Sequence, residues 1–241
     1  MSFFEIRNLK KSFGKVVVAD NISFAINKGE FVGIIGPNGA GKTTLYHMIT
    51  GIVKPTSGDI LFKGEKITGL PTHKIVQKGL SRTFQIPRPF KELTVMENIE
   101  VANAVRDPSS SLEERAERVL KQVGLWEQRN QLASNLPQGD LRRLEVARAL
   151  ATSPEFLLLD EPFAGLNTAE MQGMVQLCLD LHRNGLTILI VEHKLKELMQ
   201  MVQRVIAIDF GKLIADDIPE RVVKNERVLK AYMGDRRWNL A

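Results

Sequence analysis

Eight consecutive residues near the start of the chain combine glycines with a lysine and a threonine. Residues 36–43 are Gly-Pro-Asn-Gly-Ala-Gly-Lys-Thr, which fits the pattern G-x-x-x-x-G-K-[ST]. They follow the apolar stretch 31–35 and precede a segment with helical spacing. Glycines let a backbone curl so that several N–H groups converge on one anion, and a helix N-terminus adds partial positive charge. We therefore predict a triphosphate site, with Lys42 neutralising the β- and γ-phosphates and Thr43 binding Mg²⁺.

Acidic residues follow a second apolar stretch. Residues 156–159 are Phe-Leu-Leu-Leu, and Asp160 and Glu161 come directly after them. Open α/β sheets place ligands at the carboxyl ends of their strands. Asp160 is therefore predicted to join the Mg²⁺ shell, and Glu161 to polarise the attacking water as a general base.

Two further polar residues end predicted strands. His193 lies just past the strand 187–191 and is predicted to donate a hydrogen bond to the γ-phosphate. Gln85 ends a predicted strand at 80–85, where it would contact Mg²⁺ or the attacking water. His47, His73 and His182 have no such placement and are interpreted as surface or packing residues.

The spacing of apolar residues predicts an α/β fold. Segments before residue 35 alternate as strands and hairpins do, with turns at Gly14, Asp20-Asn21 and Lys28-Gly29. Later strands and helices alternate, which favours a mostly parallel sheet with helices on both faces. The predicted later strands are 60–63, 80–85, 156–159, 187–191 and 205–209, and the predicted helices are 42–50, 169–182, 195–202 and 219–234. Residues 87–152 are helical and more polar, with a capping box at Ser111–Glu114 and a helix end at Gly124, so we interpret them as an inserted subdomain.

Composition narrows the class of protein. The chain has 241 residues, of which 44% are hydrophobic and 25% are charged, as in a packed globular domain. The net charge of +5 comes from scattered basic residues, so a solvated surface is a better interpretation than a nucleic-acid site. No apolar stretch is long enough to span a bilayer. The single cysteine, Cys178, cannot form an internal disulfide, which favours a reducing cytosol.

The order of these motifs resembles the ATP-binding-cassette (ABC) family over essentially the whole chain. Its most diagnostic part is the signature segment, residues 136–145 (Leu-Pro-Gln-Gly-Asp-Leu-Arg-Arg-Leu-Glu). In the family this segment caps the γ-phosphate of the ATP bound to the opposite subunit. Pro137 and Asp140 stand where serine and glutamine are common, which removes one hydroxyl and adds a negative charge. One possibility is an asymmetric heterodimer in which this signature serves a weaker site.

The resemblance implies a P-loop NTPase fold with a RecA-like core, an N-terminal antiparallel β subdomain and an inserted α-helical subdomain. It implies one nucleotide-binding domain over 1–241, with 1–86 and 153–241 as the core and antiparallel β subdomain and 87–152 as the helical signature subdomain. The catalytic residues would be Glu161, His193, Lys42 and Gln85, and the Mg²⁺ residues Thr43, Gln85 and Asp160. The residues implied in ATP binding are Phe13 (stacking on adenine), Gly36, Pro37, Asn38, Gly39, Ala40, Gly41, Lys42, Thr43, Thr44, Pro137, Gln138, Gly139 and Asp140.

The resemblance also implies partners. A second ABC subunit, identical or different, would complete two ATP sites, and a loop at Ala164–Asn167 would communicate between them. Membrane permease subunits would dock near residues 85–100 on the cytoplasmic face, with a solute-binding protein acting indirectly. Segments 82–98 and 227–234 look like the branch that serves hydrophobic (branched-chain) amino-acid importers.

Three alternatives stay open. The lipopolysaccharide-export ATPase branch shares several of these features. An ABC ATPase acting on DNA or ribosomes would normally carry two cassettes, a coiled-coil arm or a zinc insert. A non-hydrolysing interaction module would not need Asp160, Glu161 and His193 together.

Overall fold

A computed structural model describes residues 2–103 and 112–233. The chain divides into two compact units. Unit 1 comprises Met1–Gly69 and Val191–Ala241, and unit 2 comprises Leu70–Ile190. Over the described residues, we find no helix with the length and apolar character that a membrane span requires.

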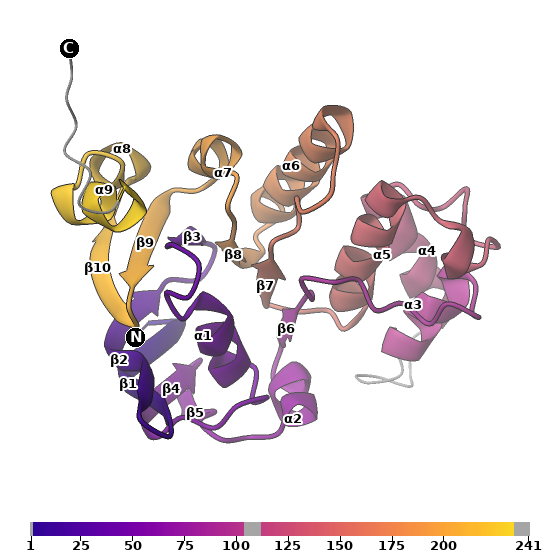
Figure 1. Cartoon of the computed structure of the whole chain (residues 1–241). Helices are drawn as coiled ribbons and strands as arrows, with labels where there is room; N and C mark the ends of the chain where they lie inside the picture. The colour runs from indigo at the N-terminus through magenta and orange to yellow at the C-terminus, as the bar shows by residue number, and fades with distance from the viewer. Residues whose placement is uncertain (1, 104–111, 234–241) are drawn as a thin grey trace, which may run out of the picture. The chain divides into compact units, whose positions relative to one another are not determined.

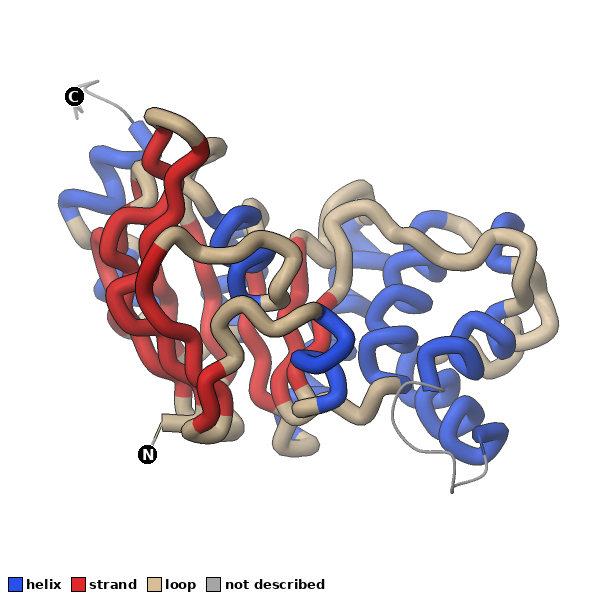
Figure 2. Tube along the Cα trace, turned by 90° about the horizontal axis from the view of Figure 1, so that it is seen from below, coloured by secondary structure: helices blue, strands red, loops and turns tan. Residues whose placement is uncertain are grey.

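Unit 1 contains an antiparallel sheet with the strand order β2-β1-β4-β5 (red in Figure 2). The strands are β1 (Phe4–Phe13), β2 (Val16–Ile26), β4 (Ser57–Phe62) and β5 (Glu65–Lys66). β1 and β2 form a hairpin around Gly14, whose φ of 58° suits glycine. The turn predicted at Asp20-Asn21 is wrong: β2 continues through both residues. The register of β1 and β2 shifts near these residues, and Asn21 has a φ of 59°, a conformation that asparagine tolerates.

The other strands of unit 1 are β3 (Phe31–Ile35), β9 (Arg204–Asp209) and β10 (Lys212–Asp217). β3 pairs in parallel with β9, and β9 pairs antiparallel with β10. Every residue of β3 is buried, as expected for a strand covered on both faces. The helices are α1 (Lys42–Ile49), α7 (Leu195–Met201), α8 (Pro219–Val222) and α9 (Glu226–Met233). The single helix predicted for 219–234 is wrong, because it is divided into α8 and α9.

Unit 2 contains β6 (Leu80–Arg82), β7 (Phe156–Asp160) and all but the last residue of β8 (Thr187–Val191), with β7 between the other two. β6 pairs with β7 in parallel, and β7 and β8 are buried along their whole length. Helix α2 (Thr72–Gln77) precedes β6, and α6 (Thr168–Arg183) lies between β7 and β8 in the chain. The strand predicted at 80–85 is shorter than expected, so Gln85 lies in a loop.

Three helices of unit 2 pack against one another: α3 (Val95–Asn103), α4 (Leu112–Val123) and α5 (Gln138–Ala151) (Figure 1). A short 3₁₀ turn, η1 (Ala133–Asn135), precedes α5. Gly124 ends α4 with a φ of 74°, as predicted. The capping box predicted at Ser111 lies outside the described residues.

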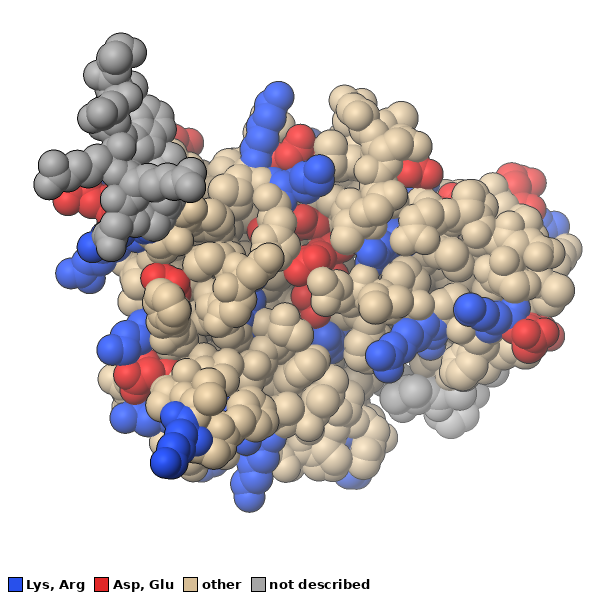
Figure 3. All heavy atoms as spheres, in the orientation of Figure 1, with Lys and Arg blue, Asp and Glu red and all other residues tan. Residues whose placement is uncertain are grey.

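These elements confirm the predicted α/β class, with an antiparallel N-terminal sheet and a helical segment. The face in Figure 3 carries Lys and Arg side chains interspersed with Asp and Glu. On this face the basic side chains of the described residues form no continuous patch (Figure 3).

Candidate functional site

The P-loop, residues 36–43, connects β3 to α1 within unit 1. Gly39 and Gly41 have φ values of 82° and 102°, which glycine adopts without strain. A Cβ on Gly41 would collide with the carbonyl oxygen of Val18, so the loop needs glycine there for close packing as well. No side chain of the described residues caps the N-terminus of α1, and its first turn contains no acidic residue. This helix end therefore fits an anion such as a phosphate group.

The Lys42 ammonium folds back over the P-loop. Its Nζ donates hydrogen bonds to the carbonyl oxygens of Gly36 at 2.6 Å and Pro37 at 3.0 Å. Lys42 is 7% exposed, so its charge is held at the loop rather than in solvent. Thr43 follows it with an exposed side chain. This arrangement fits the predicted roles of Lys42 on a phosphate and of the Thr43 hydroxyl on a metal ion.

Two other predicted site residues belong to unit 1. Phe13, at the end of β1, is 50% exposed, and its ring is available for stacking on a base. The ammonium of Lys11 lies 4.7 Å from the centre of this ring. His193 is exposed in the loop between β8 and α7, and its backbone N–H donates to Glu192 Oε2 at 3.0 Å. The buried Glu192 carboxylate thus shapes this loop, a role that the sequence did not predict.

Asp160 ends β7 in unit 2 and forms a buried ion pair. Arg82 Nη2 lies 2.9 Å from Asp160 Oδ2, and the side chains are 6% and 3% exposed. The backbone N–H of Asp160 also donates to the Thr83 hydroxyl at 3.1 Å. Arg82 thus neutralises part of the carboxylate charge and fixes its orientation, because breaking a buried pair is costly.

The described residues contain no group of three or more His, Cys, Asp and Glu side chains that would hold a metal ion. Mg²⁺ does not require such a cage, since it usually binds one or two protein oxygens together with waters and substrate phosphates. The donor set predicted for Mg²⁺, a threonine hydroxyl, an aspartate and a glutamine amide, consists of the hard oxygen ligands that this ion prefers.

Glu161 and Gln85 come together in unit 2. Gln85 Nε2 donates to Glu161 Oε2 at 2.9 Å, although 76 residues separate them in the chain. Glu161 has a φ of 48°, which is uncommon for a residue with a side chain. Such strain persists where the surroundings hold the residue, often at functional sites. The pair places a carboxylate and an amide side by side, as a base and a water-orienting group would require.

The signature segment begins α5 within unit 2. Pro137 is the N-cap residue, and no side chain of the described residues caps this helix. A Cβ on Gly139 would meet the carboxylate end of the Glu170 side chain from α6, which would have to shift to make room for it. Asp140 is partly buried, and that burial, with a smaller contribution from Glu170, raises the pKa of its carboxyl above the usual value; Arg143 opposes the shift.

The loop at Ala164–Asn167 leads into α6. Asn167 is its N-cap: the side chain accepts from Glu170 N–H at 3.0 Å, and Glu170 Oε2 accepts from Asn167 N–H at 2.9 Å. Asn167 and Glu170 have the spacing of a capping box, which is a sequence signal for the start of a helix. Asn167 therefore has a structural role at the N-terminus of α6.

Arg142 of α5 is a functional candidate that the sequence analysis missed. Its buried guanidinium donates to the carbonyl oxygen of Ala164 through Nε at 3.2 Å and Nη2 at 2.9 Å. Its Nη1 donates to the carbonyl oxygen of Gln85. One planar group therefore ties the signature helix to the loop of Gln85 and to the loop that follows Glu161. A lysine would not form this fork.

We expect Arg142→Lys to lower kcat for ATP hydrolysis by about tenfold, because Gln85 would lose its fixed position beside Glu161. A double-mutant cycle with Gln85→Ala checks the cause. If Arg142 acts through Gln85, its substitution has little further effect in the Gln85→Ala background. Additive effects on kcat would show that Arg142 acts independently of Gln85.

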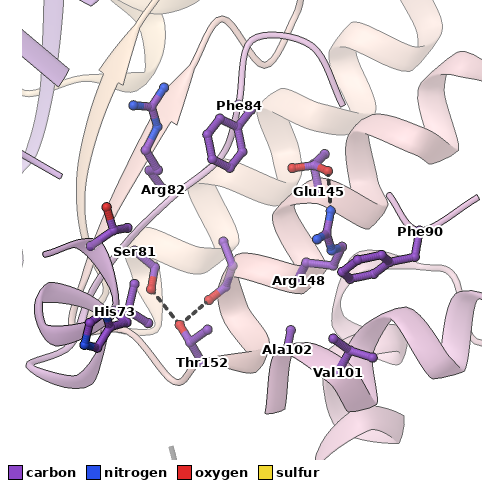
Figure 4. Close-up of a pocket in the computed structure, with 13 residues that line it drawn as sticks. His73, Ser81, Arg82, Phe84, Phe90, Val101, Ala102, Glu145, Arg148 and Thr152 are labelled. Carbon is purple, nitrogen blue, oxygen red and sulfur yellow. Dashed lines mark hydrogen bonds and ion pairs between the residues drawn. The ribbon is translucent and has the colours of Figure 1, made fainter. Parts of the chain in front are cut away.

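A pocket of about 560 Å³ lies within unit 2 among residues of α2, β6, α3 and α5 (Figure 4). Phe84, Phe90 and Val101 give it apolar walls. Arg148 lies over the Phe90 ring at 5.1 Å and forms an ion pair with Glu145 at 2.7 Å. Figure 4 shows these side chains gathered around the cavity.

The loop on one side of this pocket is held at several points. Glu145 Oε1 accepts from the backbone N–H of Arg88 at 2.8 Å, and Arg148 Nη1 donates to the Arg88 carbonyl at 2.6 Å. The buried Asn98 side chain accepts from the Phe90 N–H at 2.8 Å and donates to the Phe90 carbonyl at 3.0 Å. Phe90 and Val101 are nevertheless 46% exposed each. The pocket therefore has a fixed rim with apolar side chains on the surface.

The model of the ABC transporter family matches residues 19–164, which include the P-loop, the signature segment and Asp160-Glu161. The chain belongs to the ABC transporter family. This cassette is thus an ATP-binding and ATP-hydrolysing subunit.

Curated relatives match the cassette over nearly its whole length. The branched-chain amino acid transport ATP-binding protein LivG of Salmonella typhimurium is 39% identical, covering 95% of this chain and 97% of the relative. BraF of Pseudomonas aeruginosa, a protein of the same description, is 38% identical over 96% and 97%. The lipopolysaccharide export ATP-binding protein LptB of Haemophilus influenzae is 36% identical over 98% and 99%.

Solved structures of ABC cassettes are similar as well. The ADP conformation of MJ1267, a cassette of an ABC transporter, has a TM-score of 0.88 and 30% identity, covering 98% of this chain and all of that one. A dimeric post-hydrolysis structure of MJ0796 with ADP and Pi has a TM-score of 0.81 and 26% identity, covering 90% of this chain and 98% of that one. These similarities confirm the predicted fold class.

Proposed function

We propose that this cassette powers the import of branched-chain or other hydrophobic amino acids, bound peripherally to the cytoplasmic face of the membrane. The observation that carries the proposal is the identity of 38–39% to LivG and BraF over nearly the full length of both chains. The cassette acts with a second ATPase subunit, identical or different, and with permease subunits that receive their solute from a binding protein.

The residues of the P-loop bind the triphosphate. The Lys42 ammonium, which the carbonyl oxygens of Gly36 and Pro37 hold at the loop, neutralises the β- and γ-phosphates, while the N-terminus of α1 faces the same charge. Phe13 stacks on the adenine. Thr43, Gln85 and Asp160 are the residues that would hold Mg²⁺, which supplies positive charge for the transferring phosphoryl group when it is bound.

Glu161 accepts the proton of the attacking water as general base. Gln85, hydrogen-bonded to Glu161, orients that water, and His193 donates to the γ-phosphate. Each group stabilises charge that develops during hydrolysis.

A second cassette completes each site. The signature helix α5 presents an N-terminus that no described side chain caps, which suits a phosphate from the opposite subunit. The N-terminal positions Pro137, Gln138, Gly139 and Asp140 would line that contact. Arg143 lies close enough to Asp140 to act electrostatically on its carboxyl, and its positive charge offsets part of the repulsion between that carboxylate and a phosphate. The dimeric structure of MJ0796 supports pairing of this kind.

The pocket of unit 2 is the proposed contact for a permease. A short permease helix with an apolar face would bury Phe90 and Val101, and a carboxylate on that helix would meet Arg148. The loop on its rim also contains Gln85, so the contact reaches the proposed catalytic residues through continuous chain.

Phe90→Ala tests this contact in the reconstituted transporter. We expect ATP-driven uptake to fall about tenfold or more, because a buried aromatic anchor typically contributes at least 2 kcal/mol to an interface. ATP hydrolysis by the isolated subunit should change less than twofold. Val223→Ala, another exposed apolar residue outside the pocket, is the control. Uptake that is equal in the two variants would exclude Phe90 from the permease contact.

Proteoliposomes that contain this cassette together with candidate amino-acid permease subunits test the transported substrate. ATP-dependent uptake of radiolabelled leucine in the presence of the binding protein is the expected result. The identity to LptB favours lipopolysaccharide export as the second candidate. Release of lipopolysaccharide without leucine uptake would replace the first proposal with the second.

A further inference from the structure

The first residue of the P-loop lies one position beyond the end of a sheet ladder. β3 pairs with β9 up to Ile35 and Ala207, and the next residue, Gly36, is buried. A Cβ on Gly36 would collide with the carbonyl oxygen of Ile208, so its backbone packs directly on β9. A buried backbone N–H at this place needs an acceptor, because leaving it unpaired is costly.

The acceptor is a tyrosine hydroxyl from the C-terminal helix. The Gly36 N–H donates to Tyr232 Oη at 2.8 Å, across 196 residues of sequence. Both residues belong to unit 1. Tyr232 is 39% exposed as a whole residue, and the partial burial of its hydroxyl raises the pKa of that group above its usual value.

The same glycine holds the phosphate-binding lysine. The carbonyl oxygen of Gly36 accepts from Lys42 Nζ at 2.6 Å. Gly36 is therefore fixed through its N–H by Tyr232, and it fixes Lys42 through its carbonyl oxygen. The far side of the P-loop is held as well, since Gly211 N–H donates to the carbonyl oxygen of Ala40 at 3.0 Å.

We propose that Tyr232 is a positioning residue for nucleotide binding, which acts by holding Gly36 in the conformation that presents Lys42 to the phosphates. The C-terminal helix α9 thereby becomes part of the nucleotide site without contacting the nucleotide. This inference rests on the assignment of Lys42 to phosphate binding. Preorganised binding groups lose less entropy when a ligand arrives, so loss of the hydroxyl should weaken affinity rather than slow the chemical step.

Tyr232→Phe removes only the hydroxyl. Calorimetric titration with Mg-ATP is expected to give a Kd about three- to tenfold higher than that of the unchanged chain, the size expected for one lost hydrogen bond to a buried N–H. KM should rise by a similar factor, while kcat at saturating ATP stays within about twofold. Leu229→Ala, a half-exposed residue of the same helix, is the control and should leave Kd unchanged.

The outcomes separate the alternatives. A Kd equal to that of Leu229→Ala would overturn the proposal. A fall in kcat together with a lower melting temperature without nucleotide would also overturn it, because that pattern means general damage to unit 1. If the wild-type protein does not bind Mg-ATP, the assignment of Lys42 to phosphate binding is wrong, and the inference about Tyr232 is wrong with it.

Discussion

Replacement of Glu161 by glutamine is expected to lower kcat for ATP hydrolysis by about 10²- to 10⁴-fold, the usual contribution of a general base. Glutamine keeps the size of the side chain and its hydrogen-bonding capacity toward Gln85, but it cannot accept the proton of the attacking water. Affinity for Mg-ATP should stay within a few-fold. Phosphate release at saturating ATP measures turnover, and calorimetry on the same variant measures binding.

Glu127→Gln, at an exposed glutamate of unit 2, is the matched control for the loss of one negative charge. It should leave turnover unchanged. If Glu161→Gln hydrolyses ATP at a rate within threefold of the unchanged chain, another group is the base. A variant that still hydrolyses ATP consumes the nucleotide, so size-exclusion chromatography should then show no stable ATP-bound dimer. A variant that has lost its base keeps ATP intact, and the closed dimer should accumulate.

Fully buried strands and the helix that follows the glycine-rich P-loop could be predicted from the sequence. β3, β8 and α1 have the bounds that apolar runs and the P-loop pattern indicate, within one or two residues. The short elements β5 and α2 were missed, because two and six residues give no measurable periodicity. β10 was missed because its apolar run, Leu213–Ala215, is only three residues long and stands between charged residues.

The segment 219–234 was predicted as one last helix that begins at Pro219. The structure interrupts it at Asn225, whose side chain accepts from the Arg227 N–H at 2.9 Å and so begins a new helix. The asparagine was a visible N-cap signal. Its effect depends on which competing hydrogen bonds the tertiary structure offers, and local sequence does not encode these.

The predicted site residues could be placed at strand ends from their motifs, but the groups that hold them could not. Arg82 meets Asp160 across 78 residues, and Arg142 meets Gln85 across 57. Tyr232 meets Gly36 across 196 residues. Such contacts arise only when the chain has folded, so no local pattern predicts them. Roles in catalysis stay predictions for all of these residues.

Lys42→Ala is expected to raise the Kd for Mg-ATP by about 10²- to 10³-fold, because deletion of one partner of a desolvated charge contact costs several kcal/mol and each 1.4 kcal/mol is about tenfold. The carbonyl oxygens of Gly36 and Pro37 would also lose the hydrogen bonds that Lys42 Nζ donates to them. Titration with Mg-ATP measures the effect, and Lys74→Ala, an exposed lysine of unit 2, controls for the lost charge. Binding as tight as in that control would mean that the P-loop does not hold the triphosphate. We expect a larger loss of affinity for Lys42→Ala than for Tyr232→Phe. That order would show that Lys42 contacts the phosphates directly and that Tyr232 supports the P-loop.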